Sequence, residues 1–441
     1  MSIVNTAQGK SDLSSGLLDT SPIGVKRAAF SATVGNMLEF YDFITYSFFA
    51  IQIGHTFFPS QSEYGSLMLS LATFGAGFIT RPIGGIVLGI YSDRIGRRPA
   101  MLLSFALMGS AIIVISITPS YNTIGLAAPI IVIIARMLQG FALGGEVGPT
   151  TAYLLEIAPP ERRALVISLQ PTSQEIAATA GALVGFILTQ TMTPAELESY
   201  GWRIAFLIGA IALPFGFWMR RTLPETIPQT ESGTTRPERS GHFTLARRYS
   251  RVIVLALTIL ASGTISTYVT QYMTTYAQNT LHIAPSVAFA TSLVSNGLQI
   301  IGALLGGWLA DRYGRKPIMI APQIIVLFLT YPTFLWIVGA PGGWSLLFGF
   351  GVLSLIGSLP FTAFYATFTE ALPQAIRGGV FATVYAVAIA SFGGTAQLVV
   401  TWLLHISGNP LAPAWYLLLA AAVGLLAMAS MPETAPVKGG K

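Results

Sequence analysis

The chain has 441 residues, of which 53% are hydrophobic and only 10% are charged, with a formal net charge of +6 at pH 7. This composition excludes a soluble globular protein. The basic residues lie mostly in short loops between apolar runs, which argues against nucleic-acid binding. The sequence has no cysteine, which excludes disulfides and cysteine-ligated metal sites, and its four histidines show no metal-ligand spacing, so we expect no metal site.

The first 24 residues are rich in Ser, Thr, Gly and Asp and show no apolar periodicity, so we predict a disordered cytoplasmic tail over 1–24. Apolar stretches of about 20 residues, each able to cross a bilayer core of roughly 30 Å, then recur along nearly the whole chain. They predict an all-α membrane protein. We place twelve transmembrane helices near residues 27–51, 64–91, 98–118, 124–153, 162–190, 202–222, 250–277, 285–310, 317–339, 343–371, 377–405 and 412–431.

A long polar stretch divides these helices into two sets of six. It covers 223–249 and is rich in Pro, Thr and Arg, so we predict a cytoplasmic linker there. The predicted domains are a six-helix bundle over 25–222, a second bundle over 250–431 and a cytoplasmic tail over 432–441.

The basic residues are distributed unevenly between the two sides of these helices. Twenty-one of the 24 Lys and Arg residues fall on the side of the chain ends, and the exceptions are Arg81, Arg136 and Arg203. By the positive-inside rule both termini are cytoplasmic. A basic residue inside an apolar span is costly and usually lines a cavity or pathway. Arg203, at the outer start of its helix, reads instead as an interface residue.

The two halves repeat one another. The loop GIYSDRIGRRP at 89–99 returns as GWLADRYGRKP at 307–317, and LPET at 223–226 returns as MPET at 431–434. A third pair, EIAP at 156–159 and EALP at 370–373, has a similar offset. A duplicated six-helix unit explains all three repeats.

The repeated loop and the Pro-Glu-Thr exits resemble the major facilitator superfamily. Within it, GNMLEFYDF at 35–43, Arg81-Pro82 and RMLQGFALGGE at 136–146 resemble the metabolite–proton symporter family. Residues 57–69 and 123–129 resemble its citrate and tricarballylate carriers, although Glu175 stands where those carriers are expected to have an amide. The resemblance implies two six-helix bundles around a central cavity that opens to either side in turn.

The repeated loop also predicts a gate on the cytoplasmic side. A carboxylate at the inner end of a helix can accept hydrogen bonds from a helix N-terminus or pair with the arginines that follow it. The alternative is that these charges only set the topology. The candidate gating residues are Asp93, Arg94, Arg97, Arg98, Asp311, Arg312 and Arg315.

Several charges lie near the middle of the predicted membrane. Asp42 and Arg136 fall on helices that line the cavity in this architecture, so they could form an ion pair that a substrate carboxylate breaks, freeing Asp42 to take a proton. The alternative is a fixed pair that only orients the two helices. Glu39, Glu146 and Glu175 are further proton-coupling candidates, of which Glu146 is placed to help control closure on the inner side.

Arg136 and Arg81 are the candidates for binding substrate anions, unless Arg81 only pairs with a neighbouring acid. The second half has no charge at mid-membrane, and its polar residues there are Tyr and amide side chains. Single tyrosines usually pack between helices, but their grouping with amides favours a cavity. We therefore predict further substrate-binding residues at Tyr268, Gln271, Tyr272, Asn296 and Gln299.

These residues predict a secondary transporter of the bacterial inner membrane that imports an organic acid with protons by alternating access. The resemblance favours a tricarboxylate, citrate or tricarballylate; a dicarboxylate, shikimate or a betaine-type zwitterion are the alternatives. A membrane sensor that does not transport is a further alternative. We find no catalytic motif and expect neither enzymatic activity nor a cofactor, with the proton as coupling ion. The expected partners are the small organic acid, protons and the lipid bilayer, and we expect the monomer to be functional.

Overall fold

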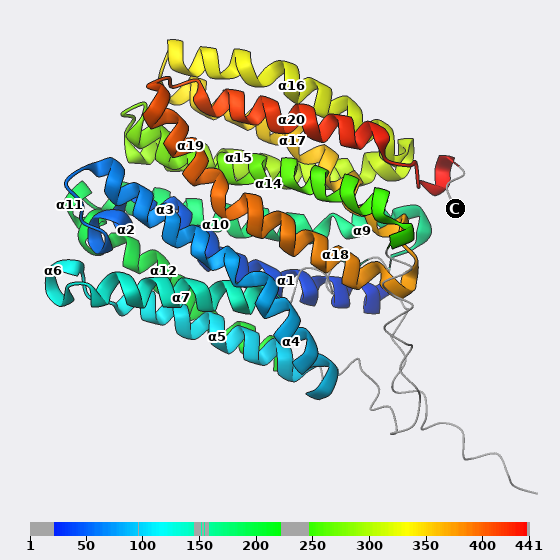
Figure 1. Ribbon diagram of the computed structural model, residues 1–441, viewed down its shortest axis with the longest axis horizontal. Helices are drawn as coiled ribbons and strands as arrows, with labels where there is room; N and C mark the ends of the chain where they lie inside the picture. The colour runs from blue at the N-terminus through cyan, green and yellow to red at the C-terminus, as the bar shows by residue number, and fades with distance from the viewer. Residues whose placement is uncertain are drawn as a thin grey trace, which may run out of the picture.

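The computed structural model describes residues 22–95, 97–144, 151, 154, 158–221 and 247–438. Over these residues the chain is helical, without a β-strand, and the long helices lie roughly side by side (Figure 1). Most of the predicted tail (1–24) and linker (223–249) lies outside the described residues. The helices form two bundles of six spans each, as the repeat predicts.

The first bundle contains several spans that are divided into two or more elements. Its elements are α1 (Pro22–Phe48), α2 (Ala50–Phe57), α3 (Glu63–Ile79), α4 (Arg81–Ile95), α5 (Arg97–Ile117), α6 (Tyr121–Ile124), α7 (Ala127–Leu143), η1 (Pro160–Arg162), α9 (Arg163–Ile167), α10 (Leu169–Thr191), α11 (Pro194–Glu196), η2 (Leu197–Gly201) and α12 (Trp202–Arg221). The break between α3 and α4 precedes Pro82, which has no backbone N–H to continue the helical ladder.

The second bundle has longer unbroken helices. Its elements are α14 (Ser250–Asn279), α15 (Pro285–Tyr313), α16 (Arg315–Gly339), α17 (Gly343–Glu370), α18 (Gln374–Ala388), η3 (Ile389–Gly393), α19 (Gly394–Ser407), α20 (Ala412–Ser430) and η4 (Pro436–Lys438). The π-helical turn η3 divides one predicted span, 377–405, near the level of the central cavity.

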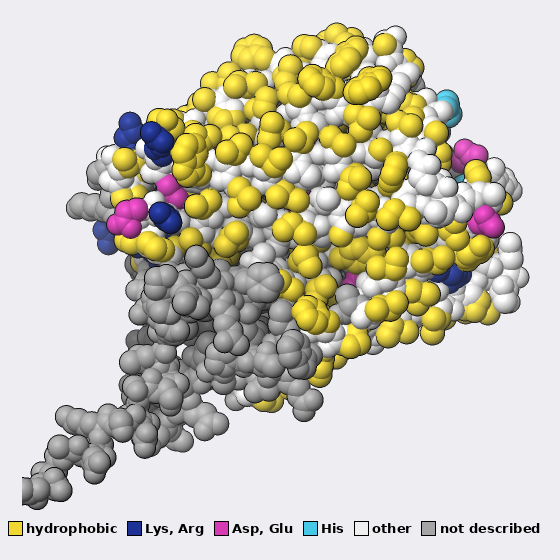
Figure 2. Space-filling view, turned by 180° about the vertical axis from the view of Figure 1, so that it is seen from behind, with side chains coloured by type: hydrophobic (Ala, Val, Ile, Leu, Met, Phe, Trp, Pro, Cys, Tyr) yellow, Lys and Arg dark blue, Asp and Glu magenta, His cyan; other side chains and the backbone are white. Residues whose placement is uncertain are grey.

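Hydrophobic side chains cover the outer surface between the two ends of the helices. Figure 2 shows them over the middle of one face, with most charged side chains gathered at the two ends. Large apolar residues such as Ile211, Phe328 and Leu426 are exposed there. Eight helical stretches of the described residues are long and apolar enough to cross a membrane, and two shorter apolar helices, Leu102–Ile117 and Ala127–Leu143, accompany them. This surface fits a lipid bilayer.

The two ends of the bundles differ in their charges. One end of the bundles carries the turns before α9 and α16, together with the last described residues of the chain (Figure 1). It holds Arg163, Arg312 and Lys316, and we call it the basic end. We call the end that carries α6 and α11 the opposite end. The sequence predicts that the basic end faces the cytoplasm.

Small residues allow helices α3, α4 and α7 to meet backbone to backbone. A Cβ added at Gly140 would collide with the Gly77 carbonyl oxygen, and one at Gly144 would collide with that of Arg81. These contacts press α7 against the junction of α3 and α4. They fix the positions of the two helices that carry Arg81 and Arg136.

Candidate functional site

Two arginines are buried in the interior of the first bundle. Arg81, the first residue of α4, is 3% exposed, and Arg136, on α7, is fully buried. The Nη1 group of Arg136 donates a 2.6 Å hydrogen bond to Oε1 of Gln139, one turn further along the helix. Moving a guanidinium out of water costs free energy, so the groups around both arginines must stabilise the buried charges.

Aromatic rings supply much of those surroundings. The guanidinium carbon of Arg81 lies 4.4 Å from the Phe43 ring centroid, and that of Arg136 lies 4.3 Å from the same centroid. Phe78 makes a second such contact with Arg81, and Tyr46 makes one with Arg136. Each cation–π contact contributes about 0.5–2 kcal/mol, with the larger value in desolvated sites.

Neither arginine forms an ion pair within the described residues. The Nε and Nη2 groups of both side chains are buried and have no hydrogen-bond partner there. A polar neighbour of Arg81 is the phenol of Tyr268, which belongs to α14 of the other bundle. Two cations with free donors can accept an anion, and carboxylates suit guanidinium groups best.

Asp42 directly precedes Phe43 in the chain, but its buried side chain faces another helix. Its side chain is 1% exposed, and a Cβ at Gly209 of α12 would collide with its Oδ1 atom. That oxygen has no hydrogen-bond partner among the described residues, and Asp42 does not form an ion pair with Arg136 there. One residue step turns a helix by about 100°, which is why Phe43 faces the arginines and Asp42 faces α12.

A cavity of about 140 Å³ lies between α10 and the second bundle. Among its lining residues are Gln174, Glu175, Tyr268, Gln299, Tyr365 and Tyr385. Gln174 donates a 3.3 Å hydrogen bond to the Tyr385 hydroxyl and so joins the two bundles at this cavity. Among the described residues that line it, Glu175 is the one acid, and the others are polar and uncharged or apolar.

The other predicted binding residues of the second half do not line this cavity. The Tyr272 hydroxyl accepts a hydrogen bond from Thr401, and the Asn296 amide oxygen accepts one from Gln299. Gln271 is buried on α14. The amide of Gln174 was not among the predicted residues, although a polar side chain inside an apolar helix is a signal that points to it.

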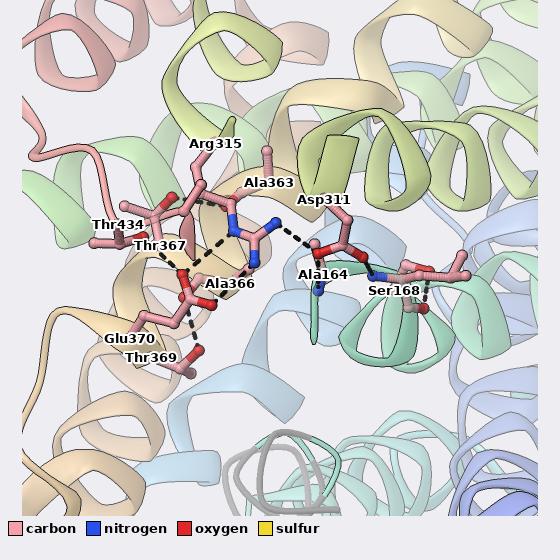
Figure 3. Close-up of polar contacts among 12 residues, drawn as sticks. Ala164, Ser168, Asp311, Arg315, Ala363, Ala366, Thr367, Thr369, Glu370 and Thr434 are labelled. Atoms are coloured by element: carbon pink, nitrogen blue, oxygen red, sulfur yellow. Dashed lines mark hydrogen bonds and ion pairs between the residues drawn. The ribbon is translucent and has the colours of Figure 1, made fainter. Parts of the chain in front are cut away.

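A polar cluster connects the two bundles at the basic end (Figure 3). Asp311, at the end of α15, accepts hydrogen bonds of 3.0 and 2.9 Å from the backbone N–H groups of Ala164 and Leu165 at the start of α9. These N–H groups have no partner inside their own helix, so the carboxylate satisfies them. Asp311 also forms an ion pair with Arg315, with 2.7 Å between Oδ1 and Nη1.

Arg315 extends this cluster within the second bundle. Its Nη2 group lies 3.0 Å from Oε1 of Glu370, and Thr434 donates a 2.7 Å hydrogen bond to the same carboxylate (Figure 3). Arg312 has no part in these bonds and packs its guanidinium on the Trp308 ring instead. The side chains of Asp93, Arg94, Arg97 and Arg98, the first copy of this loop, lie outside the described residues, as do those of Glu39 and Glu146.

Glu433 caps the start of α16. Its carboxylate accepts hydrogen bonds from the backbone N–H groups of Arg315 and Lys316, both at 3.0 Å. Burial alone would raise the pKa of Glu433, but the backbone donors that surround the carboxylate outweigh it and hold that pKa below its ordinary value. The chain after the last span is thereby fastened to the basic end.

Contacts between the bundles also close the opposite end. The Tyr64 and His405 rings stack with centroids 3.8 Å apart. Further in, a Cβ at Gly75 of α3 would lie 2.7 Å from the carbonyl oxygen of Gly394 of α19, so these backbones touch. The bundles are therefore joined at both ends, and the central cavity lies between the two sets of contacts.

Arg203 has a separate environment near the opposite end. It donates a 2.7 Å hydrogen bond to the Ser116 carbonyl and packs on the Trp202 ring at 4.4 Å. The hydrogen bond joins α12 to α5. Both contacts fit the interface role that its place in the sequence predicts.

Residues 32–390 match the sequence profile of the Major Facilitator Superfamily. The chain is 36% identical over 414 residues to a citrate-proton symporter of Salmonella typhi, covering 93% of this chain and 95% of that protein. It is 32% identical over 405 residues to an alpha-ketoglutarate permease of Escherichia coli (strain K12), covering 90% of this chain and 92% of that protein.

The fold is also found among solved structures. A crystal structure of a D-xylose-proton symporter matches with a TM-score of 0.74 at 19% identity, covering 94% of this chain and 98% of that chain. A partially occluded inward-open structure of the xylose transporter XylE from E. coli matches with a TM-score of 0.72 at 17% identity, covering 93% of this chain and 98% of that chain. At these identities the likeness concerns the fold alone.

Proposed function

Because the chain belongs to the major facilitator superfamily, we propose that it is a secondary transporter that imports an organic acid together with protons. The favoured substrate is a tricarboxylate, citrate or tricarballylate. Two relatives, citrate-proton symporters of Salmonella typhi and Klebsiella pneumoniae, support it at 36% identity over most of the chain.

One observation carries this proposal: Arg81 and Arg136 are buried, lie on one aromatic ring and form no ion pair within the described residues. In our proposal the carboxylates of the substrate supply the missing negative charges. Tyr268 and Gln299, which line the cavity between α10 and the second bundle, would bind the hydroxyl and remaining oxygen atoms of the substrate.

The proton would be carried by Asp42. The side chain is buried without an ionic partner among the described residues, an environment that favours the neutral acid. Glu175 is the second candidate because it lines the same cavity as Tyr268 and Gln299. In this scheme the two bundles move as units over 25–222 and 250–431, with both termini cytoplasmic and the monomer as the working unit.

Alternating access would follow from breaking one set of end contacts at a time. The bonds of Asp311 with α9 hold the basic end closed, and the contacts of α3 with α19 hold the opposite end closed. Since both sets are present among the described residues, we assign the structure to an occluded state in this scheme.

The proposal is tested by uptake of labelled citrate into proteoliposomes at acid outside pH, with and without a protonophore. We expect accumulation that collapses when the protonophore is added. Absence of uptake from a correctly oriented, folded preparation would exclude citrate, and uptake insensitive to the protonophore would exclude proton coupling.

A dicarboxylate is the second candidate substrate. Two guanidinium groups match two carboxylates, and the relative named alpha-ketoglutarate permease is 32% identical to this chain. Competition between labelled citrate and unlabelled alpha-ketoglutarate separates the two, because the true substrate displaces the other at lower concentration.

A further inference from the structure

Phe43 follows Asp42, the proposed proton carrier, in the chain, and its ring contacts Arg81 and Arg136, which are proposed to bind the substrate. We propose that its ring is the positioning element that holds Arg81 and Arg136 as one unit, and that it thereby selects substrates with two or more carboxylates over monocarboxylates. This inference rests on the proposed function and adds a specificity-determining residue to it.

The geometry singles out Phe43 among the rings around the arginines. Phe78 makes a cation–π contact with Arg81, whereas Tyr46 and Phe74 make theirs with Arg136. Within the described residues, Phe43 is the ring that contacts both guanidinium groups. Since each guanidinium carbon lies close to the same centroid, the two carbons are at most about 9 Å apart.

The Phe43 ring is itself held in place. It is fully buried and packs edge-on against Phe78, with centroids 4.9 Å apart, and against Phe74 at 5.1 Å. A Cβ at Gly77 would lie 3.7 Å from an edge carbon of this ring, so the backbone of α3 contacts it as well. A ring fixed on several sides fixes the two cations that lie on it.

The charges explain why this arrangement discriminates between substrates. Two cations so close together in a poorly hydrated interior repel one another, and no acidic side chain of the described residues neutralises them. A ligand with two carboxylates neutralises both cations in one binding event. A monocarboxylate leaves one cation uncompensated, and therefore binds with a weaker net attraction.

The test uses the purified full-length protein and isothermal titration with citrate, tricarballylate, alpha-ketoglutarate and acetate. We expect the wild type to bind one or more of citrate, tricarballylate and alpha-ketoglutarate at least tenfold more tightly than it binds acetate. Phe43→Leu removes the shared ring face while it keeps an apolar side chain. It should lower the affinity for that ligand about tenfold and leave the affinity for acetate nearly unchanged. Phe43→Tyr keeps the ring face and should retain the preference.

Two control variants separate positioning from packing. Phe48→Leu, on the same helix, removes a buried ring whose contact is with Phe289 and should leave the preference unchanged. Phe78→Leu removes a cation–π contact of Arg81 and one of the rings that hold Phe43, but it leaves the Phe43 ring against both arginines, so it should weaken the preference less than Phe43→Leu does. If Phe43→Leu does not fold, Phe43→Met supplies a flexible side chain of similar reach without a ring.

The possible results are distinct. An unchanged preference in Phe43→Leu, or equal binding of acetate and the polycarboxylates by the wild type, overturns the inference but leaves organic-acid transport standing. A folded wild type that binds no carboxylate of the panel overturns both the inference and the proposed function.

Discussion

The amide nitrogen of Gln397 donates a 2.6 Å hydrogen bond to the Ser47 hydroxyl, joining α19 of the second bundle to α1 of the first. The same amide nitrogen donates to the backbone carbonyl of Tyr268 at 3.2 Å, so the side chain also holds α14. Both Ser47 and Gln397 are buried. This contact lies between the cavity and the opposite end, where it helps to keep the two bundles together.

Replacing Ser47 by alanine should loosen the opposite end. The loss of one buried hydrogen bond of about 1 kcal/mol shifts an equilibrium between closed and open forms by about fivefold. The measurement is the labelling rate of a single cysteine at Asn279, beside the cleft at that end, in this cysteine-free chain. Thr56→Ala serves as control, because Thr56 bonds its own helix; equal rates in both variants would contradict the prediction.

Asp311→Asn should open the basic end. The variant weakens the capping of α9 and leaves Arg315 with Glu370 as its remaining ionic partner, so we expect labelling of a cysteine at Ser168 to increase about tenfold or more. Glu370→Gln is the matched control, since it removes the other partner of Arg315 without touching α9. The gating role of Asp311 would be refuted by an increase in the control and none in Asp311→Asn.

Asp42→Asn should separate substrate binding from proton coupling. An amide at this position cannot exchange a proton, so uphill uptake at acid outside pH should fall at least tenfold while exchange of labelled for unlabelled substrate persists. Both activities are measured in the same proteoliposomes. Retained uphill uptake would move the coupling role to another acid, and Glu175→Gln then becomes the variant to examine.

Gly209→Ala should reproduce part of the Asp42→Asn defect without changing the acid itself. The added methyl group would occupy the position of Asp42 Oδ1, so the carboxyl must turn away from α12. We expect a shifted pH profile of uptake and an uphill rate reduced about tenfold. Gly216→Ala, seven residues further on α12, collides with Phe105 and Leu38 instead and should leave the pH profile as it is.

Glu433→Gln should loosen the start of α16. Because hydrogen bonds from backbone N–H groups favour the charged form, the lowered pKa means that the stabilisation is complete above the ordinary Glu pKa of about 4.3 and is lost as pH falls through the folded value. We expect about tenfold faster amide hydrogen exchange at Arg315 and Lys316 in the variant. Unchanged protection at pH 7 would contradict this.

Helix positions could be predicted because length and hydropathy determine them. The predicted spans 343–371 and 412–431 correspond to α17 (Gly343–Glu370) and α20 (Ala412–Ser430). The helix breaks before Arg81 and before Gly394 could not be predicted from length and hydropathy, because the apolar pattern continues through both of them. The repeated loop predicted that Asp311 would accept hydrogen bonds from a helix N-terminus or pair with a following arginine, and Asp311 makes both contacts here, while its gating role stays a prediction.

Side-chain direction within the first bundle was harder to predict. Depth along the helix placed Asp42 and Arg136 at one level, but it does not say which neighbour each side chain faces, and here Asp42 faces Gly209. Nothing in the sequence distinguishes the ring of Phe43 from an ordinary packing residue. Its contact with both arginines depends on the approach of α3, α4 and α7, which is a property of the tertiary structure.

The contact between Gly75 and Gly394 has a consequence for the speed of movement. Large side chains that interlock must change rotamer before two surfaces can part, and each change adds to the activation barrier. Here the backbones of Gly75 and Gly394 touch with no side chain between them, so α3 and α19 can slide or separate at this contact without a rotamer change of either residue. Movement along this contact needs no rotamer change of these two residues, whereas the hydrogen bond of Gln397 with Ser47 must break before the bundles part.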